Sequence, residues 1–186
     1  TDKKNWDGLD LPWMAFGYGI SITPLQTLTF YNAIANDGIM LRPRFLREVK
    51  DFDKKVEIFN KEIINPSICS IETAKKVQKM MQNVVEKKHG TAHNIYSSNF
   101  SMAGKTGTCQ TEYWKESGLY ISSFAGYFPV ENPKYSCIVV IHKPEKEIGY
   151  YGNIVAAPVF KKIAQKIYSE TAIEQTIDGF ENLNVE

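Results

Sequence analysis

The sequence of 186 residues has no long apolar run and almost no net charge. No stretch approaches the roughly eighteen consecutive apolar residues that a membrane-spanning helix needs, so these residues predict no span. Lysine and arginine together number 22 and aspartate and glutamate 21, which leaves a net charge of +1. Nucleic-acid-binding domains carry a basic charge or a basic patch, so this balance argues against a nucleic-acid partner.

Cysteine and histidine are scarce, and neither is arranged as a metal site. The three cysteines, Cys69, Cys109 and Cys137, cannot all pair with one another, and their apolar or strand-like surroundings predict buried free thiols. His89 and His93 lie four residues apart, but no glutamate follows His89, so the H-E-x-x-H zinc pattern is absent. The sequence therefore predicts no metal and no other cofactor.

Apolar residues are plentiful enough for a folded core, at 43% of the chain with 12% aromatic. The capping box of Thr23 and Gln26, with proline between them, predicts a helix that ends at Gly38. Its predicted inward residues are Leu25, Leu28, Tyr31, Ile34 and Ala35.

Two further helices are predicted from caps and apolar spacing. One begins after the N-cap Ser70 and ends near Lys88, and its predicted inward residues are Val77, Met80, Met81, Val84 and Val85. The other opens at Pro158, and its predicted sheet-facing residues are Val159, Phe160, Ile163, Ala164 and Ile167.

Strands are predicted between and after these helices. Residues 45–49 and 56–59 flank a polar hairpin turn at 51–55, and residues 122–128 and 135–142 flank a turn with two prolines. The continuous apolar run from Val139 to Ile141 is typical of a strand that is covered on both faces. Antiparallel strands with helices before and after them predict an α+β fold.

The most informative segment is Gly104-Lys105-Thr106-Gly107-Thr108. Successive side chains of a strand alternate faces, so Lys105 and Gly107 share one face while Thr106 and Thr108 share the other. A glycine inside a strand usually marks a bulge or the close approach of a ligand or another backbone. One cation, two hydroxyls and an open backbone position therefore predict a strand edge that holds an acyl substrate.

Gly-Lys-Thr also ends the pattern of a phosphate-binding P-loop, G-x-x-x-x-G-K-[ST]. The first glycine of that pattern would fall at position 99, which is Asn99. A P-loop must also run into a helix, and the residues after Thr106 have poor helix propensity. Two interpretations remain: a glycine-kinked strand without function, or the K-T-G element of penicillin-binding proteins and serine β-lactamases.

Other segments resemble class B penicillin-binding proteins, in the order that this family has them. They are G-Y-G-I-S-I-T-P-L-Q at residues 17–26, N-A-I-A-N-D-G at 32–38, G-T-A at 90–92, S-F-A-G-Y-F-P at 123–129, Y-G at 151–152 and A-P-V-F at 157–160. K-T-G alone is a weak signal, but the set spans roughly residues 17–168 and is specific.

The nucleophile of that family is missing from these residues. Family enzymes carry a serine in S-x-x-K and a second element S-x-N, both upstream of K-T-G. None of the eleven serines here is followed three positions later by lysine. Ser97-Ser98-Asn99 spells S-x-N but lies six residues before Lys105, so it is interpreted as a polar turn that enters the strand.

The resemblance implies the C-terminal portion of a transpeptidase domain at residues 1–169. The implied fold is a partial penicilloyl-serine transferase fold, in which an antiparallel sheet is flanked by helices and the K-T-G strand lines the cleft. Residues 170–186, with five acidic and no basic side chains, are predicted to form an acidic peripheral or mobile tail. The parent enzyme would lie on the outer, periplasmic face of the cytoplasmic membrane, held by an N-terminal anchor outside these residues.

The resemblance also implies the chemistry of the parent enzyme, a peptidoglycan D,D-transpeptidase. Its serine would attack the D-Ala-D-Ala bond of a peptidoglycan stem peptide, and an amine of a neighbouring strand would take up the acyl group. Lys105 would supply a positive field and position the S-x-N serine, and the backbone N–H of Thr108 would be one oxyanion donor. The hydroxyls of Thr106 and Thr108 would bind the substrate carboxylate, and Gly107 would leave room for the peptide.

The implied partners are stem peptides, β-lactams as substrate mimics, a glycosyltransferase and the missing N-terminal part of the same domain. Without that part, the exposed strand edge predicts self-association. Two alternatives stay open, a β-lactamase or β-lactam sensor of the same fold and a noncatalytic scaffold domain. A role in cell division or in cell-shape elongation is not distinguished by the sequence.

Overall fold

The computed structural model describes residues 8–52, 54–111 and 119–181. Its elements are α1 (Asp10–Ala15), α2 (Pro24–Ala35), β1 (Met40–Leu41), β2 (Glu48–Asp51), β3 (Lys54–Ile58), β4 (Ile63–Asn65), α3 (Ile71–Glu86), the 3-10 helix η2 (His93–Ile95), β5 (Ala103–Thr111), β6 (Leu119–Phe128), β7 (Tyr135–His142), α4 (Gly152–Val155) and α5 (Ala157–Glu181). No helix among these residues has the length and apolar character that crossing a membrane requires.

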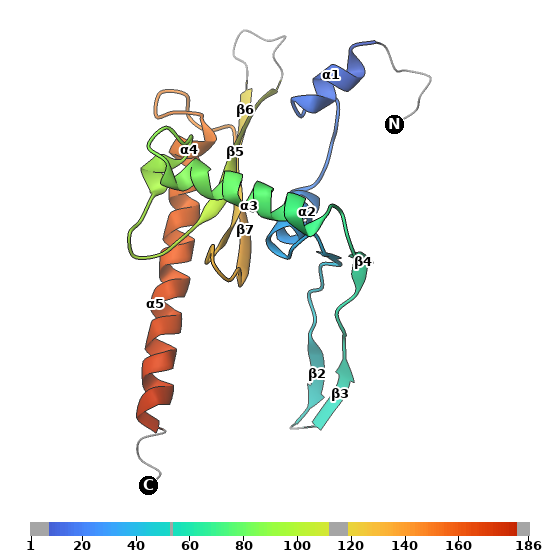
Figure 1. Cartoon of the computed structure of the whole chain (residues 1–186), viewed down its shortest axis with the longest axis vertical. Coiled ribbons are helices and arrows are strands. Elements are labelled where there is room, and N and C mark those ends of the chain that lie inside the picture. Colours follow the sequence, from blue (N-terminus) through green and yellow to red (C-terminus); the bar gives the residue numbers. More distant parts are fainter. Residues whose placement is uncertain (1–7, 53, 112–118, 182–186) are drawn as a thin grey trace.

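The main sheet has three antiparallel strands in the order β5-β6-β7. Lys105 pairs with Ala125 and Gly107 with Ser123 across β5 and β6, and Phe124 pairs with Val139 across β6 and β7. The small pairs β1-β4 and β2-β3 form separate two-stranded sheets, and the β2-β3 hairpin projects away from the main body (Figure 1). Antiparallel strands with flanking helices confirm the predicted α+β class.

Helices pack on both faces of the main sheet. On one face Phe124 packs with Phe160 of α5 and with Val85 of α3. On the other face Tyr127 packs with Ile34 of α2 and with Met81 of α3. Because α3 contributes to both clusters and contacts β5, it packs beside this edge strand (Figure 1). The position of β5 is therefore determined by helices as well as by its pairing with β6.

The predicted helix starts are confirmed in detail. The Thr23 hydroxyl accepts a hydrogen bond from the Gln26 amide, and the Gln26 side chain accepts one from the Thr23 amide, which completes the capping box of α2. Ser70 caps α3 by accepting from the Thr73 amide. These side chains satisfy backbone donors that have no partner inside the first helical turn.

Some residues predicted to face inward are exposed. Met80 is 67% exposed, Leu25 42%, Val159 40% and Ile163 37%. The predicted inward stripes were too wide, because each helix buries only the part of its surface that meets the sheet. In α3 that part includes Met81 and Val85, and in α5 it includes Phe160 and Ala164; the relative exposure of each of these is 5% or less.

Three further sequence predictions need correction. The run Val139–Ile141 is covered less completely than predicted: Val139 is buried and Val140 and Ile141 are half-buried, although β7 contacts α2 and α5, which lie on opposite faces of the sheet. The turn of the first hairpin is shorter than the predicted 51–55, since β2 and β3 pair up to Asp51 and Lys54. The three cysteines are free as predicted but only half-buried.

The C-terminal residues that were predicted to form a tail begin inside α5, which continues to Glu181. Residues 182–186 lie outside the described part of the chain.

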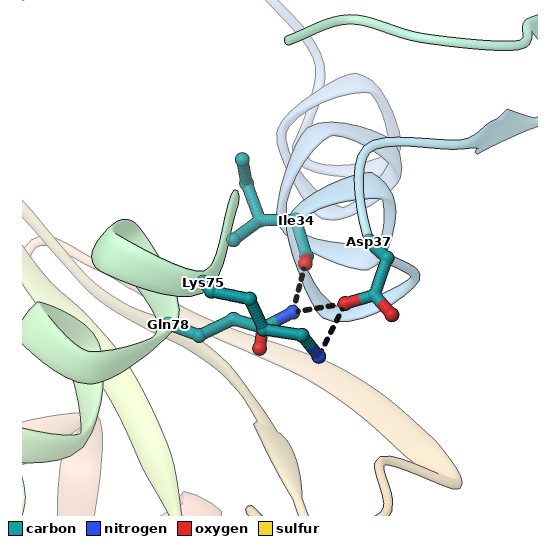
Figure 2. A network of polar contacts seen from close by, with 4 residues as sticks. All are labelled: Ile34, Asp37, Lys75 and Gln78. Atoms are coloured by element: carbon teal, nitrogen blue, oxygen red, sulfur yellow. Dashed lines mark hydrogen bonds and ion pairs between the residues drawn. The ribbon is translucent and has the colours of Figure 1, made fainter. Parts of the chain in front are cut away.

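A polar network joins the end of α2 to α3 (Figure 2). Gln78 donates to the Ile34 carbonyl at 2.7 Å and to the Asp37 carboxylate at 2.9 Å, and Lys75 lies 2.6 Å from the same carboxylate. The hydrogen bonds from Lys75 and Gln78 hold the pKa of Asp37 below its ordinary value. These contacts link the C-terminal end of α2 to α3.

Two glycines face each other across β5 and β6, Gly104 and Gly126. A Cβ at Gly126 would overlap the Ala103 carbonyl oxygen, and a Cβ at Gly104 would lie 2.5 Å from the Phe124 ring. Both positions therefore require glycine because a side chain would overlap neighbouring atoms, and not because the backbone needs the conformational freedom of glycine.

We expect Gly126→Ala to lower the free energy of unfolding by about 1–3 kcal/mol or more, the usual cost of overpacking. Urea denaturation measures it. Gly8→Ala is the matched control, since a Cβ there meets nothing within 4 Å. Equal stability of the two variants would contradict this account of the strand pair.

The outer edge of β7 has no strand partner among the described residues. An unpaired edge is a template for association, so we expect the 186-residue chain to self-associate or to bind a complementary segment. Light scattering checks the first outcome. A compact monomer in which the amides of residues 139–141 are fully protected from exchange would contradict the prediction.

Candidate functional site

The predicted site residues lie together on β5, an edge strand that pairs only with β6 in the described structure. Lys105 and Thr108 are exposed, and Thr106 and Gly107 are half-buried. Because alternate residues of an edge strand direct their backbone N–H and C=O groups away from the sheet, this strand presents unpaired polar groups beside a cation and two hydroxyls.

The amine of Lys105 turns back along the strand edge. Its Nζ donates to the Thr106 carbonyl oxygen at 2.9 Å and to the Thr106 hydroxyl at 3.5 Å. Alternation places the two side chains on opposite faces, but the flexible stem of lysine carries the charge across the edge. The structure thus brings a cation and a hydroxyl together at the open side of β5.

Thr108 is held from the other direction by α4. Its hydroxyl accepts a hydrogen bond of 3.1 Å from the Gly152 amide. The proton of that hydroxyl is therefore not used in this bond and can be donated elsewhere. Thr106 and Thr108 both face the layer of α4 and α5, since their cross-strand partners Phe124 and Ser122 do.

Gly152 lies directly on the backbone of β5 and β6. A Cβ there would overlap the Ser123 carbonyl oxygen and would lie 2.7 Å from the Gly107 carbonyl oxygen. The start of α4 therefore packs backbone to backbone against the centre of the K-T-G segment. No larger residue at position 152 could leave Thr108 where it is.

The structure gives a steric reason for glycine at position 107. A Cβ at this position would lie 2.5 Å from the Ser123 hydroxyl across the strand pair. The sequence predicted that Gly107 leaves room for a bound peptide. That role stays a prediction, because the neighbour that the structure shows is a side chain of the protein.

Thr91 is a member of the site to which the sequence assigned no role. Its hydroxyl lies 3.3 Å from the Thr106 hydroxyl, although it belongs to the loop between α3 and η2. The motif G-T-A at residues 90–92 was the available signal, but no spacing rule connects it to a strand that begins at Ala103.

An aromatic cluster lies beside the Thr108 end of the strand. The Tyr120 and Tyr150 rings stack at 4.0 Å, and the hydroxyls of Tyr150 and Tyr151 are hydrogen-bonded at 3.1 Å. Ser122, fully buried, donates to the Tyr150 carbonyl oxygen. Tyr151 is the residue before α4, so the cluster and Gly152 are positioned together.

Ser97-Ser98-Asn99 is not part of this site. The Asn99 amide donates to the Ser97 hydroxyl at 3.2 Å, which confirms the predicted polar turn. The turn lines a cavity of about 440 Å³ that extends to Met102, Glu131 and Tyr168 and that Lys105, Thr106 and Thr108 do not line. Its resemblance to S-x-N is therefore accidental.

The assembled groups are suited to binding an anion next to a polarised carbonyl. They comprise an ammonium, the hydroxyls of Thr91, Thr106 and Thr108, and the free backbone edge of β5. Within the described ranges, no three His, Cys, Asp or Glu side chains gather as metal ligands. The charge and the hydrogen-bond donors at this edge can stabilise negative charge.

Comparison with known proteins gives a consistent result. The model of the penicillin binding protein transpeptidase domain matches residues 1–165. The chain is 34% identical over 169 residues to the peptidoglycan D,D-transpeptidase FtsI of Buchnera aphidicola subsp. Baizongia pistaciae, covering 90% of this chain and 28% of that protein. It is 29% identical to stage V sporulation protein D of Bacillus subtilis, covering 86% of this chain and 25% of that protein.

Solved structures agree. The apo form of penicillin binding protein 3 of Mycobacterium tuberculosis matches with a TM-score of 0.77 and 29% identity. The match covers 91% of this chain and 40% of that one. The same protein complexed with ampicillin has a TM-score of 0.76. The chain spans 25–37% of the length of three curated relatives that it matches.

Proposed function

Because the chain belongs to the penicillin-binding protein transpeptidase family, we propose that it forms the C-terminal part of a transpeptidase domain that cross-links peptidoglycan. The observation that carries the proposal is the position of the Lys105 amine, 3.5 Å from the Thr106 hydroxyl at the open edge of β5. The relative named above as a peptidoglycan D,D-transpeptidase, FtsI, favours this function over a β-lactamase, a β-lactam sensor or a noncatalytic scaffold.

The proposed reaction is acyl transfer from a stem peptide that ends in D-Ala-D-Ala. A serine of the S-x-x-K element would attack the carbonyl between the two alanines and release the terminal D-alanine, and an amine would then displace the serine. That serine is not among the eleven of these residues, since none is followed three positions later by lysine. It would come from another part of the parent protein.

The residues of β5 would contribute electrostatic stabilisation. Lys105 is exposed and its amine already lies at the strand edge, where it can attract the terminal carboxylate of the substrate and orient the S-x-N serine. The backbone N–H of Thr108 would be one donor to the developing oxyanion. The peptide would lie along β5 as an added strand beside Gly107.

The hydroxyls of Thr106 and Thr108 are the proposed carboxylate donors. Thr108 already accepts from the Gly152 amide, so its proton is available to an anion. β-Lactams carry a carboxylate in a comparable position and would enter as substrate mimics. Penicillin binding protein 3 of M. tuberculosis, similar in structure to this chain, has been solved with ampicillin.

The setting of the parent enzyme is also a proposal. Peptidoglycan lies outside the cytoplasmic membrane, so the enzyme would act on the periplasmic side, held by an N-terminal anchor and working with a glycosyltransferase that makes the glycan strands. The relatives include FtsI and a sporulation protein. Of the two roles that the sequence leaves open, the similarity to FtsI supports cell division.

We expect the 186-residue chain by itself to form no covalent adduct with a labelled penicillin and to leave a chromogenic β-lactam intact, because it has no S-x-x-K serine. Intact-protein mass spectrometry measures this, with the full-length protein as the positive control. A stoichiometric adduct on a serine of this chain would refute the prediction.

In the full-length protein, we expect Lys105→Ala to lower the rate constant of β-lactam acylation by about a hundredfold or more, as removal of one electrostatic element does. Thermal unfolding should change little, since the side chain is exposed. Lys134→Ala, in the turn before β7, is the matched control. A Lys105→Ala variant that acylates normally, or that unfolds, would favour a purely structural strand.

A further inference from the structure

The inference concerns Thr91, which approaches the site from outside the strand that carries the other proposed residues. Its hydroxyl oxygen lies 3.3 Å from that of Thr106, and Thr106 is in turn 3.5 Å from the Lys105 amine. The three polar groups form a continuous chain in the order Thr91, Thr106, Lys105. Thr91 itself is exposed, so packing does not account for its hydroxyl.

The backbone around Thr91 is fixed on both sides. A Cβ at Gly90 would lie 2.6 Å from the Asn83 carbonyl oxygen, so Gly90 lies against the last turn of α3. Ala92 is fully buried, and its amide donates to the Val84 carbonyl at 3.0 Å. An exposed hydroxyl on an immobilised backbone loses little entropy when it binds, because its position is already set.

The numbers of donors and acceptors then decide the direction of each hydrogen bond. A threonine hydroxyl has one proton to donate and two lone pairs, whereas an ammonium can only donate. Thr106 therefore accepts from Lys105. If Thr91 also donates to it, both lone pairs of Thr106 are occupied, and its own proton must point to a third group.

We propose that Thr91 is a positioning residue, which donates to the Thr106 hydroxyl and so directs the Thr106 proton to the carboxylate of the substrate. The proposal rests on the function proposed above. A carboxylate can only accept hydrogen bonds, so its binding favours the arrangement in which Thr91 donates to Thr106. In the reverse arrangement Thr106 would donate its proton to Thr91 and have none for the carboxylate. Thr91 acts through Thr106 and does not itself touch the substrate.

The consequence is specific to the charged group of the ligand. Thr91→Val keeps the shape of the side chain and removes the hydroxyl. The Thr106 hydroxyl can then rotate, so its proton is no longer directed to the carboxylate. The full-length protein should then react about tenfold more slowly with benzylpenicillin, the scale of one hydrogen bond to a charged group. Reaction with benzylpenicillin methyl ester, which lacks the carboxylate, should change by less than about twofold.

The experiment compares second-order acylation rate constants for both compounds. Thr91→Ser should restore most of the rate with benzylpenicillin, because it restores the hydroxyl, and Thr91→Ala should behave as Thr91→Val. Thr111→Val is the matched control: it removes a hydroxyl from the far end of the same strand, where Thr111 donates to the Leu119 carbonyl at 3.2 Å.

Two results overturn the proposal alone: an unchanged rate in Thr91→Val, or equal losses with the acid and the ester, which would indicate a structural role. Either result counts against this proposal alone only when the unsubstituted protein is acylated and Lys105→Ala impairs acylation. If the unsubstituted protein is not acylated, or Lys105→Ala has no effect, the proposed function fails and this inference fails with it.

Discussion

The close packing of backbone on backbone at the centre of β5 is the constraint on which the rest of the site depends. At position 152 a Cβ would overlap the Ser123 carbonyl oxygen and would lie 2.7 Å from the Gly107 carbonyl oxygen. Glycine at this position lets α4 touch the strand, and the same contact brings the Gly152 amide to the Thr108 hydroxyl. The geometry of the site thus follows from the absence of a side chain at position 152.

The edge position of β5 has an energetic consequence. Lys105 is exposed, so water screens its charge, and its field on a distant group is weak. A substrate that lies along the strand would exclude that water and lower the local dielectric, which strengthens the attraction between the amine and a carboxylate. If the proposed function holds, the site would gain most of its electrostatic strength only when a substrate occupies it.

Local rules predicted the helix starts and the identity of the strand that carries the site. Thr23 and Ser70 cap helices through contacts within four residues, so the local sequence is enough to predict them. Burial was predicted less well. Met80 is spaced like Met81 on the apolar stripe of α3, yet only Met81 meets the sheet, because burial depends on what packs against a helix.

The amino-acid sequence by itself determined the α+β class, the K-T-G strand, the family resemblance and the roles expected of Lys105, Thr106, Gly107 and Thr108. Only the tertiary structure decided that Thr91 and Gly152 join them. Thr91 lies in a loop and Gly152 at the start of α4, 15 and 44 positions away from their partners on β5, and no periodic pattern reaches across such distances. Contacts of this kind arise when helices close over a sheet, so they depend on packing and not on local propensity.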